Sequence, residues 1–280
     1  MKGLIDYTIN VRGRLMSLRE PQVMGILNIT PDSFYSGSCK QTEVEISERT
    51  NQIIAEGGTI IDVGAFSTRP GAPQISEEDE KERLRNGLAI VRREQPDAVV
   101  SVDTFRPDIA KMCVEEFGAD IINDVSEGGI TGVANTPLEQ QEGDCPAIFR
   151  MVAQLKVPYI LMSVKPTLRE MMIAFAHEIQ LLRDLGMKDI ILDPGYGFGK
   201  TLGQNYQLMN EAEKLKALQL PILVGISRKS MIFKLLGGDP TTSLNGTTAL
   251  NTISLLKGAN ILRVHDVKET MEVVRICSQL

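Results

Sequence analysis

Polar side chains in this sequence follow short apolar runs, at the point where each run ends. The residues in that position include Asn28, Asp103, Asn123, Asp193, Arg263 and His265. Taken alone, an Asp or Asn there can simply cap a helix or begin a turn. Polar groups at the ends of seven of eight runs instead predict one concave site that holds both cationic groups and hydrogen-bond acceptors.

The basic residues of this set suit an anion. The predicted positive group comprises Arg69, Lys229, Arg263 and His265. Thr68, Ser227 and neighbouring backbone amides can complete an oxyanion or phosphate pocket, because guanidinium, ammonium and N–H groups all donate to such oxygens. The sequence therefore predicts that part of the site binds a phosphate-like group.

The acceptors suit a flat polar ring. Asp103, Asn123 and Asp193 end apolar runs and are expected to be partly buried, and a buried carboxylate needs hydrogen-bond donors. A ligand with an amidine-like edge offers two adjacent N–H groups, and one such charge-assisted bond contributes about 1.5–3 kcal/mol. That contribution is large enough to fix the orientation of a ring.

The stretch DIILDPGYGFGKT, residues 189–201, resembles a nucleotide loop because its glycines alternate and a Lys-Thr pair follows them. The P-loop pattern requires a glycine five positions before the Gly-Lys pair, and Pro194 stands there. In the dinucleotide pattern the third glycine lies three positions after the second, which Gly195, Gly197 and Gly199 do not satisfy. The spacing excludes both kinds of nucleotide loop.

A barrel would bring these residues together. Short runs rich in Val and Ile, such as VMGILNI, AVVSVD and DIILD, predict strands buried on both faces. Amphipathic segments separate them, and the expected helices are 43–56, 77–94, 107–117, 143–155, 168–185, 205–218, 244–257 and 267–277. This alternation predicts an α/β fold, a (β/α)₈ TIM barrel, with a doubly wound sheet as the alternative. In such barrels the chemistry gathers at the C-terminal ends of the strands.

The chain is expected to form a single barrel domain over residues 1–280, since no linker or compositional break divides it. Weak alternation in the first twenty residues predicts a short N-terminal β-hairpin. The composition, with 42% hydrophobic and 24% charged residues, is typical of a soluble globular protein.

Bulk properties also exclude several classes of function. The net charge of −6 argues against nucleic-acid binding, which usually needs a basic domain. No signal peptide and no membrane span are apparent. The four cysteines are widely spaced and predict reduced thiols in a cytoplasmic protein. With only two histidines, His177 and His265, a His-rich metal site is excluded.

Eight segments, in order along the chain, resemble the signature segments of the dihydropteroate synthase family. They are MGILNITPDSF, IIDVGAFSTRPGA, SVDT, INDV, DPGYGFGK, GISRKSMI, NGTTALN and RVHDV. The resemblance implies a pterin-binding TIM barrel and a transferase of folate biosynthesis. Such an enzyme joins 4-aminobenzoate to 6-hydroxymethyl-7,8-dihydropterin diphosphate and releases 7,8-dihydropteroate and pyrophosphate. It also implies Mg²⁺ as cofactor, a homodimer, and sulfonamides as mimics of the aminobenzoate.

The resemblance assigns one group of residues to the pterin. Asp103, Asn123 and Asp193 would hydrogen-bond the ring. Lys200 would lie at its polar edge beside Asp193, and Phe198 would pack near the junction of the two substrates.

A second group is assigned to the diphosphate. Asn28 would help to bind magnesium and the diphosphate. Thr68 and Arg69 would contact phosphate from the second loop, and Arg263 and His265 would cradle it from the last strand.

The remaining assignments concern the aminobenzoate and catalysis. Pro70 would lie near the aminobenzoate, while Lys229, with Ser230 beside it, would hold both the pterin and the aminobenzoate. Asp103, Lys229 and Arg69 are the predicted catalytic residues. Asp103 would stabilise positive charge on the pterin methylene, and the cations would stabilise negative charge on the leaving group.

The sequence departs from the family at two places. Ser163 and Val164 stand where a His-Met pair is usual, and Ser36 stands where the first loop commonly has an acid. Two alternatives therefore stay open, a non-catalytic pterin-binding paralogue and a pterin enzyme of the methyltetrahydrofolate methyltransferase type.

Overall fold

The computed structural model describes residues 6–29, 42–66, 75–129 and 145–280. Within them, eight parallel strands form one sheet in the order β8-β7-β6-β5-β4-β3-β10-β9. The strands are β3 (Gln22–Asn28), β4 (Ile60–Gly64), β5 (Val99–Asp103), β6 (Ile121–Asp124), β7 (Tyr159–Met162), β8 (Ile190–Asp193), β9 (Leu223–Val224) and β10 (Ile261–Val264). A parallel bridge from Leu192 to Ile222 connects the two ends of the sheet, so the strands form a near-closed barrel.

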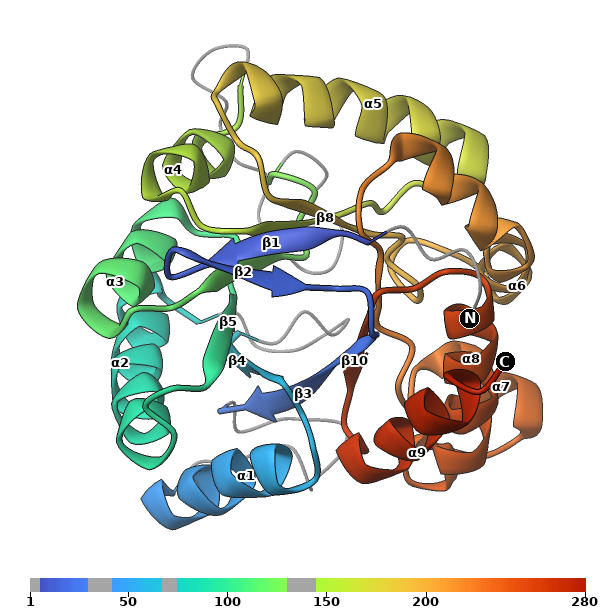
Figure 1. Cartoon of the computed structure of the whole chain (residues 1–280), viewed down its shortest axis with the longest axis horizontal. Helices are drawn as coiled ribbons and strands as arrows, with labels where there is room; N and C mark the ends of the chain where they lie inside the picture. Colours follow the sequence, from blue (N-terminus) through green and yellow to red (C-terminus); the bar gives the residue numbers. More distant parts are fainter. Residues whose placement is uncertain (1–5, 30–41, 67–74, 130–144) are drawn as a thin grey trace.

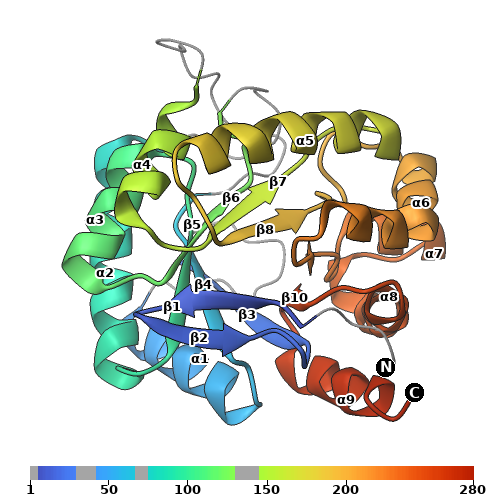
Figure 2. The same cartoon turned by 45° about the horizontal axis from the view of Figure 1, so that its top comes forward.

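Helices surround this sheet, as Figures 1 and 2 show. They are α1 (Glu43–Ala55), α2 (Glu77–Glu94), α3 (Pro107–Phe117), α4 (Ala147–Leu155), α5 (Leu168–Asp184), α6 (Leu202–Glu211), α7 (Ser230–Leu236), α8 (Leu244–Leu256) and α9 (Val267–Cys277). The prediction of a (β/α)₈ barrel is confirmed, and the doubly wound alternative is wrong because the sheet order runs round a barrel.

Two details differ from the expected helices. The helix expected at 205–218 is an α-helix to Glu211, followed by the 3₁₀-helix η2 (Ala212–Leu218). The helix α7 was not expected, because seven residues are too few to show a clear helical period. A second short 3₁₀-helix, η3 (Pro240–Thr242), connects α7 to α8.

Local signals in the sequence explain where several helices begin and end. Thr42 and Glu45 form a capping box at the start of α1, and Thr201 and Gln204 form another at the start of α6. Each box satisfies two backbone N–H groups that a helix start leaves without partners. At the end of α3, Gly118 adopts the left-handed conformation, with φ 61°, that terminates many helices.

The barrel interior has an apolar layer below a polar one. Alternate residues of each strand point inward, and the lower inward layer is Met24, Ile60, Val99, Ile121, Ile160, Ile191, Leu223 and Ile261. Two positions further along the strands, the next layer contains Asp62, Asn123, Asp193 and Arg263. The intervening residues, such as Ile61 and Val63, pack outward in the core beneath the helices. The hydrophobic residues therefore form the base and the shell of the barrel, and the polar residues form its mouth.

The N-terminal hairpin covers the apolar base. It consists of β1 (Thr8–Val11) and β2 (Arg14–Ser17), which pair antiparallel, and it lies across the end of the barrel in Figure 1. Ile9, Val11 and Leu18 are buried against the lower layer of the barrel. The predicted hairpin is confirmed, and it keeps water from the base of the barrel.

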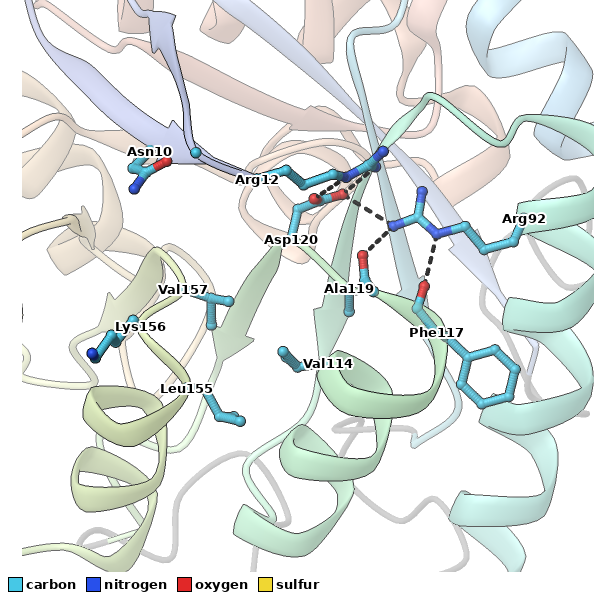
Figure 3. Close-up of a pocket in the computed structure, with 12 residues that line it drawn as sticks. Asn10, Arg12, Arg92, Val114, Phe117, Ala119, Asp120, Leu155, Lys156 and Val157 are labelled. Atoms are coloured by element: carbon cyan, nitrogen blue, oxygen red, sulfur yellow. Dashed lines mark hydrogen bonds and ion pairs between the residues drawn. The ribbon is translucent and has the colours of Figure 1, made fainter.

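An ionic network fastens the hairpin to the barrel (Figure 3). Arg12, in the hairpin turn, donates to the two carboxylate oxygens of Asp120 at 2.6 and 2.8 Å. Arg92 of α2 donates to the same carboxylate at 3.1 Å, and the backbone N–H of Val100 does so at 2.8 Å. A cleft of about 440 Å³ lies beside this network. The Asp120 side chain is fully buried, so water does not solvate the carboxylate. These donors balance its charge instead.

Within the residues that the structure describes, no helix combines the length and the apolar composition that crossing a membrane requires.

We predict that Asp120→Ala lowers the free energy of unfolding by about 3–5 kcal/mol, because two guanidinium groups lose a buried partner. Urea denaturation measures this change. The matched control is Glu116→Ala, which breaks an exposed pair with Arg85 of 2.8 Å and should lower the free energy of unfolding by less than about 1 kcal/mol. Equal effects of the two substitutions would contradict the fastening role.

Candidate active site

Arg263 lies at the centre of the polar mouth, between two carboxylates from neighbouring strands. Its Nε donates to Asp62 Oδ2 at 2.6 Å and its Nη2 to Asp103 Oδ2 at 2.8 Å. Burial alone would lower the pKa of Arg263, but the two carboxylates outweigh it and raise the pKa above its ordinary value. The guanidinium is therefore always charged, and it joins β4, β5 and β10.

Asp62 was not among the predicted site residues, although it fixes two of them. Besides Arg263, it accepts hydrogen bonds from Asn123 Nδ2, at 3.3 Å to Oδ2 and 3.5 Å to Oδ1. This contact orients the amide so that Asn123 Oδ1 is buried and has no hydrogen-bond partner within the described part of the chain. A buried acceptor without a donor costs about 1–3 kcal/mol. The mouth of the barrel thus contains an acceptor that a ligand N–H group would satisfy.

Two carboxylates lie at the same mouth, Asp193, which is buried, and Asp103, which is half-buried. Burial raises the pKa of Asp103 to about 7, although Arg263 opposes the shift. Burial also raises the pKa of Asp193, opposed by Lys229 and by the backbone N–H of Gly195, which donates to Asp193 Oδ1 at 2.8 Å. The structure brings the predicted pterin acceptors Asp103, Asn123 and Asp193 to one rim of one barrel.

Lys229 approaches the same mouth from the loop after β9. Its Nζ donates to Tyr196 O at 2.6 Å and lies 4.1 Å from the centre of the Phe198 ring. Burial lowers the pKa of Lys229 to about 7, although Asp193 opposes the shift. Gly197, with φ +82°, leaves room for this side chain, because a Cβ there would lie 3.0 Å from Lys229 Cδ.

The glycines of DPGYGFGK let the loop after β8 fold tightly against β7. Gly195 has φ +62°, and a Cβ on it would lie 2.3 Å from the carbonyl oxygen of Ser163. Lys200 then donates its three ammonium protons to Ser163 O, Gly195 O and Phe198 O, at 3.0, 3.0 and 3.1 Å. Lys200 therefore holds this loop together, and the predicted contact with a pterin would require it to release one of these bonds.

His265 does not carry the positive charge that the sequence predicted for it. Burial lowers its pKa to about 3, and Arg263 and Arg228 lower it further. The neutral ring is fixed by Ser227, whose Oγ lies 3.0 Å from Nδ1 and accepts the backbone N–H of His265 at 3.1 Å. The prediction of a positive His265 is wrong because it overlooked the neighbouring cations, and a neutral imidazole can still donate or accept a hydrogen bond.

Arg228 supports the loop that carries Ser227 and Lys229. It pairs with both oxygens of Asp266 at 2.9 and 2.8 Å and also donates to Pro240 O. Its backbone has φ 55°, which is uncommon for a residue other than glycine. The ion pair therefore stabilises a turn that would otherwise be unfavourable.

The other predicted site residues divide between the described and undescribed parts of the chain. Asn28 Oδ1 and Asp103 Cβ lie 3.4 and 3.5 Å from the Cβ that Gly64 lacks, so the two side chains flank Gly64 at the mouth. Ser230 begins α7. Thr68, Arg69 and Pro70 lie outside the described residues, as does Ser36.

The Ser163-Val164 departure is accommodated in two ways. Val164 is buried in a small apolar cluster with Val125 and Met162, against which Phe198 packs. Ser163 donates its hydroxyl proton to Glu127 at 2.9 Å. Glu127 was not predicted, because no pattern in the sequence places this loop residue beside β7.

The chain is similar to known proteins over nearly its whole length. The sequence profile of a family described as pterin binding enzyme matches residues 24–265. The dihydropteroate synthase of Escherichia coli K12 is 37% identical over 268 residues, which are 95% of this chain and 93% of that protein. The dihydropteroate synthase of Streptococcus pyogenes serotype M18 is 34% identical over 96% of this chain and 98% of its own length.

Solved structures agree with these relatives. The Yersinia pestis dihydropteroate synthase in a sulfonamide drug complex superposes with a TM-score of 0.86 at 33% identity, covering 98% of each chain. The Thermus thermophilus dihydropteroate synthase in complex with 4-aminobenzoate superposes with a TM-score of 0.81 at 30% identity, covering 98% of this chain and 100% of that one.

The neutral state of His265 predicts a pH dependence of stability. Its pKa in the folded chain, about 3, lies below the unfolded value of about 6.5. Between these values the unfolded chain binds more protons, so the free energy of unfolding decreases as the pH falls through 6.5. We predict that from pH 7 to pH 5 the parent chain loses about 2 kcal/mol more than His265→Asn does. Urea denaturation at both pH values tests this, and equal losses would show that folding does not lower the pKa of His265.

Proposed function

Because this chain belongs to the dihydropteroate synthase family of pterin-binding enzymes, we propose that it catalyses the reaction of that family. It condenses 4-aminobenzoate with 6-hydroxymethyl-7,8-dihydropterin diphosphate and gives 7,8-dihydropteroate and pyrophosphate. The enzyme is a transferase of folate biosynthesis. The observation that carries the proposal is the set of acceptors at the barrel mouth, where Asn123 Oδ1 is buried and has no hydrogen-bond partner among the described residues.

The acceptors match the edge of a pterin. The 2-amino and N3–H groups of that ring form the adjacent pair of donors that a carboxylate can receive together. Asp193 and Asn123 would accept hydrogen bonds from the ring, and Asp103 would accept a hydrogen bond from the far side of the ring. Arg263, whose Nε and Nη2 donate to Asp62 and Asp103, would lie against the ring and keep these acceptors in place.

The chemistry exchanges one bond at the pterin methylene for another. The C–O bond to the diphosphate breaks, and the amine nitrogen of 4-aminobenzoate forms a C–N bond and loses a proton. Positive charge develops on the methylene and negative charge on the leaving diphosphate. Asp103 would stabilise the former, and Arg69, Thr68, Arg263 and the neutral ring of His265 would stabilise the latter. The amine is already neutral at pH 7, so the site needs to orient it more than to deprotonate it.

Lys229 and its neighbours would orient the aminobenzoate. Lys229 lies over the Phe198 ring beside the acceptors, so it can reach both substrates, with Ser230 next to it and Pro70 on the second loop. We propose Lys229, Asp103 and Arg69 as the catalytic residues. Lys200 would contribute indirectly, because it holds the loop after β8 in place.

Magnesium would be held at the diphosphate end of the site. Among the described residues, no group of three or more His, Cys, Asp or Glu side chains is arranged to hold a metal ion. Asn28 nevertheless presents an amide oxygen at the mouth, and Mg²⁺ commonly uses one or two protein ligands together with phosphate oxygens and water. Mg²⁺ bound by Asn28 and the diphosphate would neutralise charge on the leaving group.

We further propose that the enzyme is a cytoplasmic homodimer. Large apolar side chains are exposed on the neighbouring helices α7, α8 and α9, namely Leu235, Leu236, Ile253, Leu256 and Ile276. Burying exposed apolar surface of this kind is the usual driving force of association. Among the described residues, Cys113 and Cys277 are buried thiols that form no disulfide, which suits a reducing compartment.

A pyrophosphate-release assay, with and without 4-aminobenzoate and magnesium, tests the proposed function. Release that requires all three components supports it. Tight pterin binding without aminobenzoate-dependent release would indicate a non-catalytic paralogue, and methyl transfer from methyltetrahydrofolate would indicate the methyltransferase type.

We predict that Lys229→Ala lowers kcat/KM by about 10²–10³-fold, the usual effect of removing one preorganised electrostatic donor. Arg69→Ala should have an effect of the same order. The control is Lys188→Ala, because Lys188 is exposed and distant from the strand ends that form the site. Circular dichroism would confirm that each variant is folded, and a parental rate in Lys229→Ala would refute the assignment of the site.

A further inference from the structure

Glu127, in the loop after β6, has an unusual conformation for a buried acid. Its backbone has φ 55°, and its side chain is fully buried. A residue other than glycine in this region of φ typically costs about 1–2 kcal/mol, and such strain often occurs at functional sites. The two residues that follow, Gly128 and Gly129, share positive φ values. Glycine would adopt this backbone conformation at a lower cost. The contacts of the Glu127 carboxylate must therefore offset that cost.

The carboxylate of Glu127 holds three consecutive residues after β7. It accepts the hydroxyl proton of Ser163 at 2.9 Å and the backbone N–H of Val164 at 3.4 Å. The ammonium group of Lys165 lies 3.6 Å from the same carboxylate. One side chain from the loop after β6 therefore fixes the path of the chain where β7 ends.

From this segment, further contacts lead to the proposed pterin site. Ser163 O accepts a hydrogen bond from Lys200, which also donates to Phe198 O. The Phe198 ring in turn packs below Lys229 Nζ and against the cluster that contains Val164. Glu127 is thus connected through these contacts to Val164 and to Phe198, which pack against each other.

We propose that Glu127 is a positioning residue for the pterin. It holds the segment 163–165 and, through Lys200, the loop 194–200, so that Val164 and Phe198 keep their places around the ring. This inference rests on the proposed function, because it assumes that these residues line a pterin site. Ser163, at a position where the family usually has histidine, is the partner through which Glu127 acts.

The conservative test is Glu127→Gln. An amide oxygen can still accept the Ser163 hydroxyl, but the amide group cannot also accept from Val164 N–H and balance the charge of Lys165. We expect the KM for the dihydropterin diphosphate and the Kd for 6-hydroxymethylpterin to rise about 10-fold, the effect of losing one or two hydrogen bonds. The KM for 4-aminobenzoate and the value of kcat should change by less than about 3-fold.

Glu178→Gln provides the matched control. Glu178, on α5, is also a buried acid, and its charge interacts with that of Glu127. Its Oε2 accepts no hydrogen bond from the residues that the structure describes. This variant should alter the thermal midpoint alone. If Glu127→Gln lowers the midpoint and leaves both pterin constants within about 2-fold of the parent, Glu127 is merely structural and the proposal is wrong.

Ser163→Ala tests the connection between Ser163 and Glu127. It also tests the proposal by itself if Glu127→Gln does not fold. Alone, it should raise the pterin KM about 3–10-fold. Combined with Glu127→Ala, which removes the acceptor of the Ser163 hydroxyl, it should raise the pterin KM by no more than Glu127→Ala alone, because Ser163 acts through that carboxylate. Fully multiplicative effects, or no effect of Ser163→Ala, would overturn the proposal. A parent enzyme that neither binds pterin nor releases pyrophosphate would instead refute the proposed function.

Discussion

The site depends on the ion pairs that Arg263 makes with Asp62 and Asp103 inside the barrel mouth. A guanidinium and two carboxylates withdrawn from water are stable only when each charge is balanced and hydrogen-bonded, and their geometry is therefore strictly constrained. Since the three residues come from β10, β4 and β5, these pairs set the relative positions of three strand ends. Asp62 extends the constraint to Asn123 on β6, whose amide oxygen then has no partner among the described residues. A satisfied ionic network thus creates one unsatisfied acceptor, and that acceptor is what makes the mouth suited to a ligand.

A second set of constraints comes from the loops after β7, β8 and β9. Gly195 and Gly197 have positive φ values and no Cβ. The carbonyl oxygen of Ser163 can therefore approach Gly195 closely, and the side chain of Lys229 can approach Gly197. Lys200 donates hydrogen bonds to backbone carbonyls, and the ammonium group of Lys229 lies over the Phe198 ring. Because strands supply the acceptors and a tightly bonded loop supplies the apolar and cationic groups, the half of the site that we propose for the pterin ring is already ordered without a ligand. Such preorganisation reduces the ordering that binding would otherwise require.

The barrel and most strand-end residues could be predicted from the sequence, because apolar runs alternate with amphipathic segments and polar residues end those runs. The second run also contains Asp62, but its role could not be predicted, because its partners Arg263 and Asn123 come from distant parts of the chain. The charge of His265 could not be predicted, since it depends on cations from distant parts of the chain. Glu127 also has no signal, because its role arises from contacts with a neighbouring strand end. The positions of Thr68, Arg69 and Pro70 are still predictions.

The central claim is that buried acceptors at the barrel mouth select the amidine edge of a pterin. The most direct measurement compares the binding of 6-hydroxymethylpterin with that of 6-hydroxymethyllumazine, in which an oxygen replaces the 2-amino group, by titration calorimetry. A carbonyl facing a buried carboxylate loses a donor and adds a repulsion, and sites of this kind discriminate strongly. We predict that the pterin binds at least about 10²-fold more tightly. Equal affinities for the two rings would contradict the claim.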